Sequence, residues 1–486
     1  MSKNWEMVIG LEVHVELSTK SKIFCSCTTQ FGGEPNTHCC PVCTGMPGTL
    51  PIFNGQVLEY AVKAGLALNC EIERQTRFDR KNYFYPDLPK AYQISQLYRP
   101  IAHDGYVEIE VSQGPKKIRI HEMHMEEDAG KLIHSEYGNE TYPDYNRCGV
   151  PLLEIVSEPD FRSAEEVAAY LEKIRMMFTY LGISDCKMQE GSMRADVNLS
   201  IREAGTTEFG TRTEMKNINS ISAIERAIAG EYERQCDLLE SGGKVTQETR
   251  HWNDDKKMST AMRSKENAQD YRYFPEPDIP EILVSEEYID DCRSRMPEFA
   301  PDKKERFMSE YGLSEYDAGL LVASKPESDF FEALIKGGAT AKASANWLIV
   351  HLASVMKKLS ADINGTMDFE DAGLDAEQMS YLIKEVEGGK VNRQDGIDIL
   401  TEMVKSEEVL DVKEYIASHG LEVSNDTGAL AETVAKVIAA NEQAVSEYKS
   451  GKEKAIGFLV GACMKELKGK CNPGMVKEML EAELKK

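Results

Sequence analysis

The stretch Val8-Ile-Gly-Leu-Glu-Val-His-Val-Glu-Leu17 alternates apolar and polar residues along its second half. Successive side chains of a β-strand point to opposite faces, so this period of two predicts a strand. One face is apolar and is expected to meet a core, and the other carries Glu12, His14 and Glu16. A carboxylate and an imidazole on a rigid strand can begin a metal site, but a strand with a solvated polar face has the same pattern. Spacing alone leaves both interpretations open.

Three more segments carry polar side chains that could join this face. They are His124-Met-Glu-Glu-Asp128, Met193-Arg-Ala-Asp-Val-Asn-Leu-Ser200 and Thr211-Arg-Thr-Glu-Met-Lys-Asn217. The second alternates like the first strand and puts Arg194 and Asp196 on one face. Carboxylates with a single histidine suit Mg²⁺ or Mn²⁺ better than structural Zn²⁺. The alternative, four unrelated solvated strands, has the same spacing.

Length and periodicity predict how the chain is organised. A chain of 486 residues exceeds one core, and its length suggests about three domains. Up to about residue 290, strand patterns are interrupted by helical patterns at 55–68, 163–181 and 221–239. This mixture favours an α+β domain on a largely antiparallel sheet. Beyond residue 285 nearly every segment has the three-and-four apolar spacing of helices.

Charge and hydropathy limit the function classes. No apolar run approaches the roughly 20 residues of a membrane span, and no targeting segment precedes the first strand, so we expect a cytoplasmic protein without a membrane association. A net charge of −25 argues against bulk attraction to nucleic acid. Residues 449–486 nevertheless hold nine Lys against five Glu, which predicts a local basic patch.

Five cysteines lie between residues 25 and 43. The pairs Cys25-Ser-Cys27 and Cys40-Pro-Val-Cys43 have the spacing that closes a tetrahedral four-thiolate zinc site. Cys39 and His38 are alternative ligands, although Cys40 better completes the Cys-x-x-Cys knuckle. Four thiolates leave no position open for a substrate, so the predicted zinc is structural and holds together a loop with little core of its own.

The segment from Phe78 to Gln93 interleaves basic and aromatic residues: Arg80, Lys81, Lys90, Tyr83, Phe84, Tyr85 and Tyr92. Cations can hold phosphates while aromatic faces stack a base, which fits a nucleotide or an RNA end. A rim loop with its aromatics in the core would look similar. The sequence contains neither G-x-x-x-x-G-K-[ST] nor G-x-G-x-x-G, so nucleotide chemistry would require a design without a P-loop.

These segments, in this order, resemble the family of B subunits of the tRNA-dependent aspartate/glutamate amidotransferases. The matching motifs are Ile9-Gly-Leu-Glu-Val-His-Val-Glu-Leu17, Phe78-Asp-Arg-Lys-Asn-Tyr-Phe-Tyr-Pro-Asp87, Lys90-Ala-Tyr-Gln-Ile-Ser95, His124-Met-Glu-Glu-Asp-Ala-Gly-Lys131, Glu154-Ile-Val-Ser-Glu-Pro-Asp160, Asp270-Tyr-Arg-Tyr-Phe-Pro-Glu-Pro-Asp278 and Gly457-Phe-Leu-Val-Gly461. The resemblance extends over essentially the whole chain. It is more specific than any single spacing described above.

The resemblance implies a fold and a reaction. The fold is α+β: a cradle-like catalytic domain over residues 1–293, similar to the glutamine synthetase group, then an all-α domain at 294–408 and a small helical tail domain at 409–486 that binds tRNA. The reaction uses ATP to phosphorylate the side-chain carboxylate of Glu on tRNA(Gln) or Asp on tRNA(Asn). Ammonia from a glutaminase A subunit then gives the amide, and a C subunit completes a heterotrimer.

The resemblance also implies site residues. By motif position, Glu12, His14, Glu127 and Asp196 correspond to Mg²⁺ ligands, and Glu214 to a ligand of a second, transient ion. Lys81 and Arg194 are candidates for contacts with phosphate or acyl-phosphate. Lys81, Tyr83 and Lys90 are candidates for ATP binding, and Cys25, Cys27, Cys40 and Cys43 for structural zinc. No role is assigned to Glu16.

Two alternatives stay open at this level. One is a zinc-containing tRNA-binding scaffold without chemistry of its own, against which the acidic strand positions argue. The other is an independent ligase that uses free ammonia on a small acid, which the basic tail disfavours. Which of the two misacylated tRNAs is used does not follow from the sequence.

Overall fold

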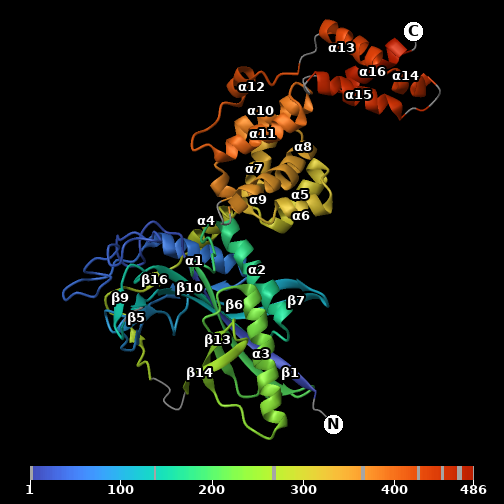
Figure 1. The fold of residues 1–486 in the computed structure, drawn as a ribbon. Helices are drawn as coiled ribbons and strands as arrows, with labels where there is room; N and C mark the ends of the chain where they lie inside the picture. The colour runs from blue at the N-terminus through green and yellow to red at the C-terminus, as the bar shows by residue number, and fades with distance from the viewer. Residues whose placement is uncertain are drawn as a thin grey trace. The chain divides into compact units, whose positions relative to one another are not determined.

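The computed structural model describes residues 4–135, 138–264, 270–362, 367–423, 427–449, 452, 454–467 and 473–484. It divides into two compact units, Met1–Phe299 and Ala300–Lys486. Figure 1 shows strands and helices in the first unit and helices in the second. The mixed α+β class predicted from the sequence is therefore confirmed.

A nine-stranded sheet organises the N-terminal unit, in the order β14-β13-β12-β11-β1-β10-β7-β6-β2. Its strands are β1 (Trp5–Glu16), β2 (Glu71–Ile72), β6 (Ala102–Val111), β7 (Gly114–Glu127), β10 (Pro151–Ser157), β11 (Met193–Glu203), β12 (Thr213–Lys216), β13 (Glu248–Asn253) and β14 (Met258–Ser264). All neighbours are antiparallel except β12 and β13. The strand that carries Glu12 and His14 is thus the middle strand of a largely antiparallel sheet.

Helices cover one face of this sheet. They are α1 (Gly55–Ala67), α2 (Ala164–Leu181) and α3 (Ile221–Glu240), close to the predicted ranges. In each helix an Asn or Ser side chain accepts a hydrogen bond from the first turn and so caps the N-terminus: Asn54, Ser163 and Ser220. In Figure 1, α2 and α3 lie side by side along the sheet. The alternate residues of β1, Leu11, Val13 and Val15, are buried in the core shared with these helices, which directs Glu12, His14 and Glu16 to the opposite face.

Short strands add elements around this unit. They are β3 (Gln75–Thr76), β4 (Asp79–Asn82), β5 (Tyr92–Ser95), β8 (Lys131–His134), β9 (Thr141–Asp144), β15 (Phe274–Pro275) and β16 (Ile282–Leu283). β4 pairs with both β5 and β15, which joins residues 79–82 to a segment almost two hundred residues later. Arg80 stabilises the pairing of β4 with β15, because its guanidinium lies 2.6 Å from the buried Glu276 carboxylate. The helix α4 (Glu286–Ser294) follows.

Helices dominate the described residues of the second unit, which also contain an isolated β-bridge between Val391 and Glu422. Its helices are α5 (Ala300–Tyr311), α6 (Glu315–Leu321), α7 (Lys325–Lys336), α8 (Ala341–Asn346), η2 (Trp347–Leu352), α9 (Ala353–Asp362), η3 (Phe369–Ala372), α10 (Ala376–Glu387), α11 (Arg393–Lys405), α12 (Val412–His419), α13 (Thr427–Ala440), α14 (Glu442–Lys449), α15 (Ala455–Glu466) and α16 (Pro473–Leu484). The π-helix η2 separates α8 from α9. The indole of Trp347 is buried there, and a Cβ at Gly396 would come within 3.0 Å of it.

The last helices have a core of their own, formed by Leu430, Val434, Val437, Leu459, Cys463, Val476, Leu480 and Leu484. The predicted boundaries at 293 and 408, the separate tail domain and the resemblance to glutamine synthetase stay predictions. Among the residues described here, no helix combines the length and the apolarity that a membrane crossing requires.

Candidate functional site

The polar face of β1 forms the centre of a site because its two neighbouring strands carry polar residues in register. Glu12 pairs with Asp196 on β11, and His14 pairs with Arg194 on the same strand. On the other side, His14 pairs with Glu154 of β10. Directly opposed residues on one face of an antiparallel pair lie within side-chain contact. Sheet register therefore brings together residues from three distant parts of the sequence.

His14 lies between two sets of carboxylates. Its Nδ1 is 3.4 Å from Glu126 and 3.8 Å from Glu154, and its Nε2 is 3.9 Å from Asp196. Glu12, His14 and Asp196 can bring one ligand atom each within 4.8 Å of the others, and His14, Glu126 and Glu154 can do the same. Oxygen ligands with one imidazole are the donor set that hard divalent cations take. The cluster can therefore hold a metal ion.

Burial and charge set the protonation of this cluster. Burial opposes the charge on His14, but the hydrogen bond to Glu126 raises its pKa. Burial likewise opposes the charge on Glu126, but hydrogen bonds from His124 and His14 hold its pKa well below the usual value. Burial, and then the charge of Glu154, raise the pKa of Glu12. The imidazoles thus supply part of the positive charge that these crowded carboxylates require.

A cavity of about 310 Å³ opens next to the cluster. His14, Glu126, Glu154 and Asp196 line it together with cations and an aromatic ring: Lys81, Arg194, Lys216 and Tyr83. Burial opposes the charge on Lys81, but Glu126 raises its pKa. Lys216 forms ion pairs with Asp196 and with Glu214, 3.0 Å away. Cations and carboxylates in one cavity can bind a phosphate and a metal side by side.

Glu16 stands at one end of this face beside Asp128 and Arg194. Burial, and then the charge of Asp128, raise the pKa of Glu16 to about 8. Asp128 in turn accepts a hydrogen bond from Arg194 at 2.7 Å. Two carboxyl groups in contact disfavour a second negative charge, which explains the direction of the shift.

Two of the predicted residues lie elsewhere. Glu127 and Glu126 are neighbours on β7, so their side chains point to opposite faces, and Glu126 joins His14. The Glu127 carboxylate instead pairs with Lys90, 2.7 Å away, and accepts a hydrogen bond from the Ile94 amide at 2.8 Å. The structure therefore does not bring Glu127 to the candidate metal ligands or Lys90 to the cavity beside them.

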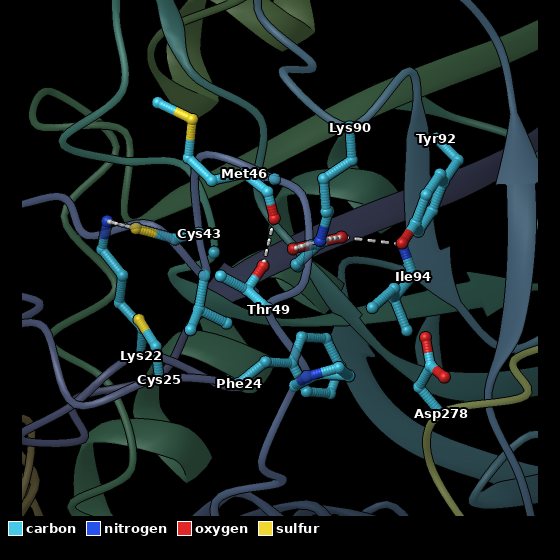
Figure 2. A pocket seen from close by; sticks show the side chains of 15 residues that line it. Lys22, Phe24, Cys25, Cys43, Met46, Thr49, Lys90, Tyr92, Ile94 and Asp278 are labelled. Atoms are coloured by element: carbon cyan, nitrogen blue, oxygen red, sulfur yellow. Dashed lines mark hydrogen bonds and ion pairs between the residues drawn. The ribbon is translucent and has the colours of Figure 1, made fainter.

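Figure 2 shows the pocket that contains the ion pair of Lys90 and Glu127. Its volume is about 120 Å³, and Phe24, Lys90 and Tyr92 line it. Lys22, which is fully buried, reaches the pocket with Nζ 3.8 Å from the Cys43 sulfur. The Lys90 ammonium lies 5.4 Å from the centre of the Tyr92 ring. The pocket thus joins the cysteine loop to a buried ion pair on the helix-covered face of the sheet.

We expect Lys90→Met to lower the free energy of unfolding of the N-terminal unit by about 3–5 kcal/mol, because it leaves a buried carboxylate uncompensated. The side chains of Lys90 and Glu127 are only 10% and 2% exposed. Urea unfolding can be followed by the fluorescence of Trp5 and Trp252 in a Trp347→Phe background.

Two further variants control this measurement. Adding Glu127→Gln should recover most of the lost stability, because no unpaired charge then stays buried. Arg74→Met removes an ion pair whose side chains are 46% and 67% exposed, and should change stability by less than about 1 kcal/mol. An unfolding midpoint of Lys90→Met equal to that of the unaltered chain would contradict the argument.

Four residues that the structure places at the site were given no role from the sequence, although the segments that carry them were singled out: Glu126, Glu154, His124 and Lys216. The sequence signal for Glu126 is the alternation within residues 124–127. In a strand, Glu126 lies on the same face as His124, and Glu127 lies on the opposite face. For Glu154 the signal is a carboxylate inside the apolar run Leu152-Leu-Glu-Ile-Val156. Such a residue requires a buried partner, and Glu154 has one in His124 at 3.1 Å.

The four cysteines predicted as ligands form a cluster. Sulfur atoms of Cys25, Cys27, Cys40 and Cys43 all lie within 4.8 Å of one another. A hydrogen bond from Cys25, partly opposed by burial, lowers the pKa of the Cys43 thiol to about 5. The alternative ligand Cys39 instead donates to the Asn36 carbonyl at 3.2 Å. This cluster can hold a metal ion as well.

Comparison with known proteins identifies the family of this chain. The family described as the GatB/GatE catalytic domain matches residues 7–290, and the GatB domain matches residues 329–484. The B subunit of the aspartyl/glutamyl-tRNA(Asn/Gln) amidotransferase of Lachnoclostridium phytofermentans is 55% identical over 484 residues, covering 100% of both chains. The protein of the same name from Lachnospira eligens is 56% identical over 99% of this chain and 100% of its own length. That of Carboxydothermus hydrogenoformans is 47% identical over 100% of both. The chain therefore belongs to the GatB family, the B subunits of the aspartyl/glutamyl-tRNA amidotransferases.

Proposed function

We propose that this chain catalyses the ATP-dependent half of tRNA-dependent amidation. A side-chain carboxylate oxygen of Glu on tRNA(Gln), or of Asp on tRNA(Asn), attacks the γ-phosphorus of ATP, and ADP leaves. Ammonia then attacks the acyl carbon of the resulting acyl-phosphate, inorganic phosphate leaves, and a proton is released as the amide forms. One observation carries the proposal: the carboxylate cluster around His14 faces the same cavity as Lys81, Arg194 and Lys216.

The cluster fits Mg²⁺, and the residues proposed to hold it are Glu12, His14, Glu126, Glu154 and Asp196. Glu214 is proposed for a second ion, since Lys216 forms ion pairs with both Glu214 and the candidate ligand Asp196. Mg²⁺ bound there would neutralise charge on the transferred phosphoryl group. Glu126 takes the place that the motif comparison assigned to Glu127.

The cations of the cavity would hold the phosphates and the acyl group. Lys81 and Lys216 bring ammonium groups to the cavity wall, and Arg194 adds a guanidinium that can bind a carboxylate or phosphate through two hydrogen bonds. We propose that Tyr83 stacks on the adenine, supported by its place beside Lys81 on the cavity wall. Lys90 is left out of the ATP site because it pairs with Glu127.

The cysteine cluster suits structural zinc. A tetrahedral ion with Zn–S bonds of about 2.3 Å separates its sulfur ligands by roughly 3.8 Å. The Cys40 and Cys43 sulfurs are 3.9 Å apart. Lys22 would offset part of the negative charge of four thiolates, with its ammonium at 3.8 Å from Cys43. Zinc there would fix the loop that forms one wall of the smaller pocket.

We propose a heterotrimer in which an A subunit releases ammonia from glutamine and a C subunit supports the assembly. The relatives are named as B subunits, which supports such a complex. The tail at 409–486 is proposed to bind tRNA, since residues 449–486 hold nine Lys against five Glu. Four of those lysines, at 468, 470, 485 and 486, lie outside the described residues.

Reconstitution tests the proposal. The chain, mixed with its A and C subunits, Mg²⁺, ATP and glutamine, is expected to convert Glu-tRNA(Gln), Asp-tRNA(Asn) or both to the amide. Each amide formed should be accompanied by one ADP. Thin-layer analysis of the released amino acid, with the two tRNAs assayed separately, also determines which substrate is used.

Absence of amide with both tRNAs would refute the proposal. Amide formed without ATP consumption would instead support the zinc-containing scaffold without chemistry. Full activity after deletion of residues 409–486 would favour a ligase that does not recognise tRNA through its tail.

A further inference from the structure

An acidic pair, of which Asp128 lines the catalytic cavity and Glu16 lies behind it, has no part in the proposed phosphoryl transfer. Asp128 lines the cavity and is 4% exposed. Glu16, the last residue of β1, lies against it in hydrogen-bond contact. Carboxylates at this position would repel the phosphates of ATP, so their presence requires another explanation.

Two guanidinium groups account for only part of the acceptor capacity of this pair. Asp128 Oδ2 accepts from Arg194 at 2.7 Å and lies 3.3 Å from Arg147 Nε, and Oδ1 accepts from the Ala129 amide at 2.8 Å. A carboxylate offers about four lone-pair directions. Arg194, the Ala129 amide and Glu16 use three of those of Asp128, and Arg147 Nε donates to the Ala129 carbonyl at 3.0 Å instead. Asp128 therefore keeps an acceptor site for a donor that enters from the cavity.

Arg194 has a donor that lacks an acceptor. Its Nε is buried and has no hydrogen-bond partner within the described part of the chain. A guanidinium N–H directed at a substrate carboxylate or acyl-phosphate would satisfy this atom. An unpaired donor on Arg194 next to spare acceptors on Asp128 fits a ligand that has both an acidic and an amino group.

The spacing along the sheet matches such a ligand. Glu16 follows His14 by two positions, which on a strand is about 7 Å. In an aspartyl or glutamyl group three or four bonds separate the carboxyl carbon from the α-nitrogen, about 4–5 Å, and a hydrogen bond adds about 3 Å. A side-chain carboxylate held near His14 therefore places the α-amino group within reach of the acidic pair.

We propose that Asp128, supported by Glu16, binds the α-amino group of the amino acid esterified to the tRNA. This inference rests on the proposed function and adds a recognition element to it. The site would then identify its substrate by two features: the side-chain carboxylate, which reacts, and the α-amino group, which does not. An acyl group of the same length that has no α-amino group would lack the second contact.

The test compares two substrates that differ at one atom. Glu-tRNA(Gln) is set beside the same tRNA charged with 2-hydroxyglutarate, in which a hydroxyl replaces the amino group. With the reconstituted complex we expect kcat/KM for side-chain amidation to fall about 10- to 100-fold for the hydroxy substrate, the range of a lost charge-assisted hydrogen bond. If Glu-tRNA(Gln) is not a substrate, Asp-tRNA(Asn) and 2-hydroxysuccinyl-tRNA(Asn) replace the pair.

Variants locate the effect. Asp128→Asn should lower kcat/KM for the amino substrate and leave the two substrates within about threefold of each other, since the group that separates them is gone. Glu16→Gln, which leaves the hydrogen bond between Arg194 and Asp128 in place, should reduce the discrimination in the same direction. The control Glu158→Gln lies at a surface ion pair with His121, and should keep full discrimination.

Each outcome decides the inference. Equal rates for the two substrates in the unaltered complex would overturn the inference about the α-amino group. The proposed function would still stand in that case, because amide is formed. Discrimination that persists in both Asp128→Asn and Glu16→Gln would show that Asp128 only positions Arg194. Loss of amide formation from every substrate would instead refute the proposed function.

Discussion

Glu126→Gln is expected to lower the rate of ATP-dependent amide formation at least about 1000-fold. Removing a metal ligand takes away several kcal/mol of transition-state stabilisation, and each 1.4 kcal/mol is a factor of ten. The carboxylate also holds His14 in place at 3.4 Å, so its loss disturbs the other candidate ligand set, Glu12, His14 and Asp196, as well. The measurement is ADP release and amide formation as a function of Mg²⁺ concentration. The Mg²⁺ concentration at half-maximal rate should rise steeply.

Its neighbour provides the matched comparison. Glu127→Gln changes the same kind of side chain one residue away, but on the other face of β7. The Mg²⁺ dependence of this variant should equal that of the unaltered chain, whatever its effect on the Lys90 pair. If Glu127→Gln shifted the Mg²⁺ dependence and Glu126→Gln did not, the assignment taken from the motif would be right and the geometric one wrong.

Cys43→Ser is expected to reduce bound zinc from one ion per chain to none in purified protein. Loss of a thiolate should weaken zinc binding by more than the roughly 10- to 100-fold that follows from losing an outer hydrogen bond. Because hydrogen bonds from Asn36 and His38 to residues 143–146 also anchor the loop, we expect local rather than global unfolding. Elemental analysis measures the metal, and limited proteolysis between residues 25 and 43 measures the loop.

Cys39→Ser is the matched control, because Cys39 is adjacent in sequence but donates to the Asn36 carbonyl. It should keep its zinc and its resistance to protease. Zinc retained in Cys43→Ser, or lost in Cys39→Ser, would require a different ligand set. Protein with intact thiols and no metal would exclude the structural zinc altogether.

Much of the N-terminal fold follows from local patterns. Alternation in β1 predicted both the strand and its buried face, and the three-and-four spacing predicted α1, α2 and α3 within a residue or two. Local sequence determines such elements because helix and strand place apolar side chains with different periods. The π-helix η2 was not predictable in this way, since it interrupts a continuous helical pattern at Trp347.

The candidate site also has features that local sequence determines and features that it does not. Sequence alone determined that Glu12 and His14 share a face and that four cysteines have the spacing of a metal site, because both are properties of residues close together along the chain. Only the tertiary structure decided that β10 and β11 flank β1, and hence that Glu154 and Asp196 meet His14. It also placed Glu126 beside His14 and Glu127 beside Lys90, because neighbouring residues of a strand point to opposite faces of the sheet. Strand order and register arise from contacts between distant segments, and no local period encodes them.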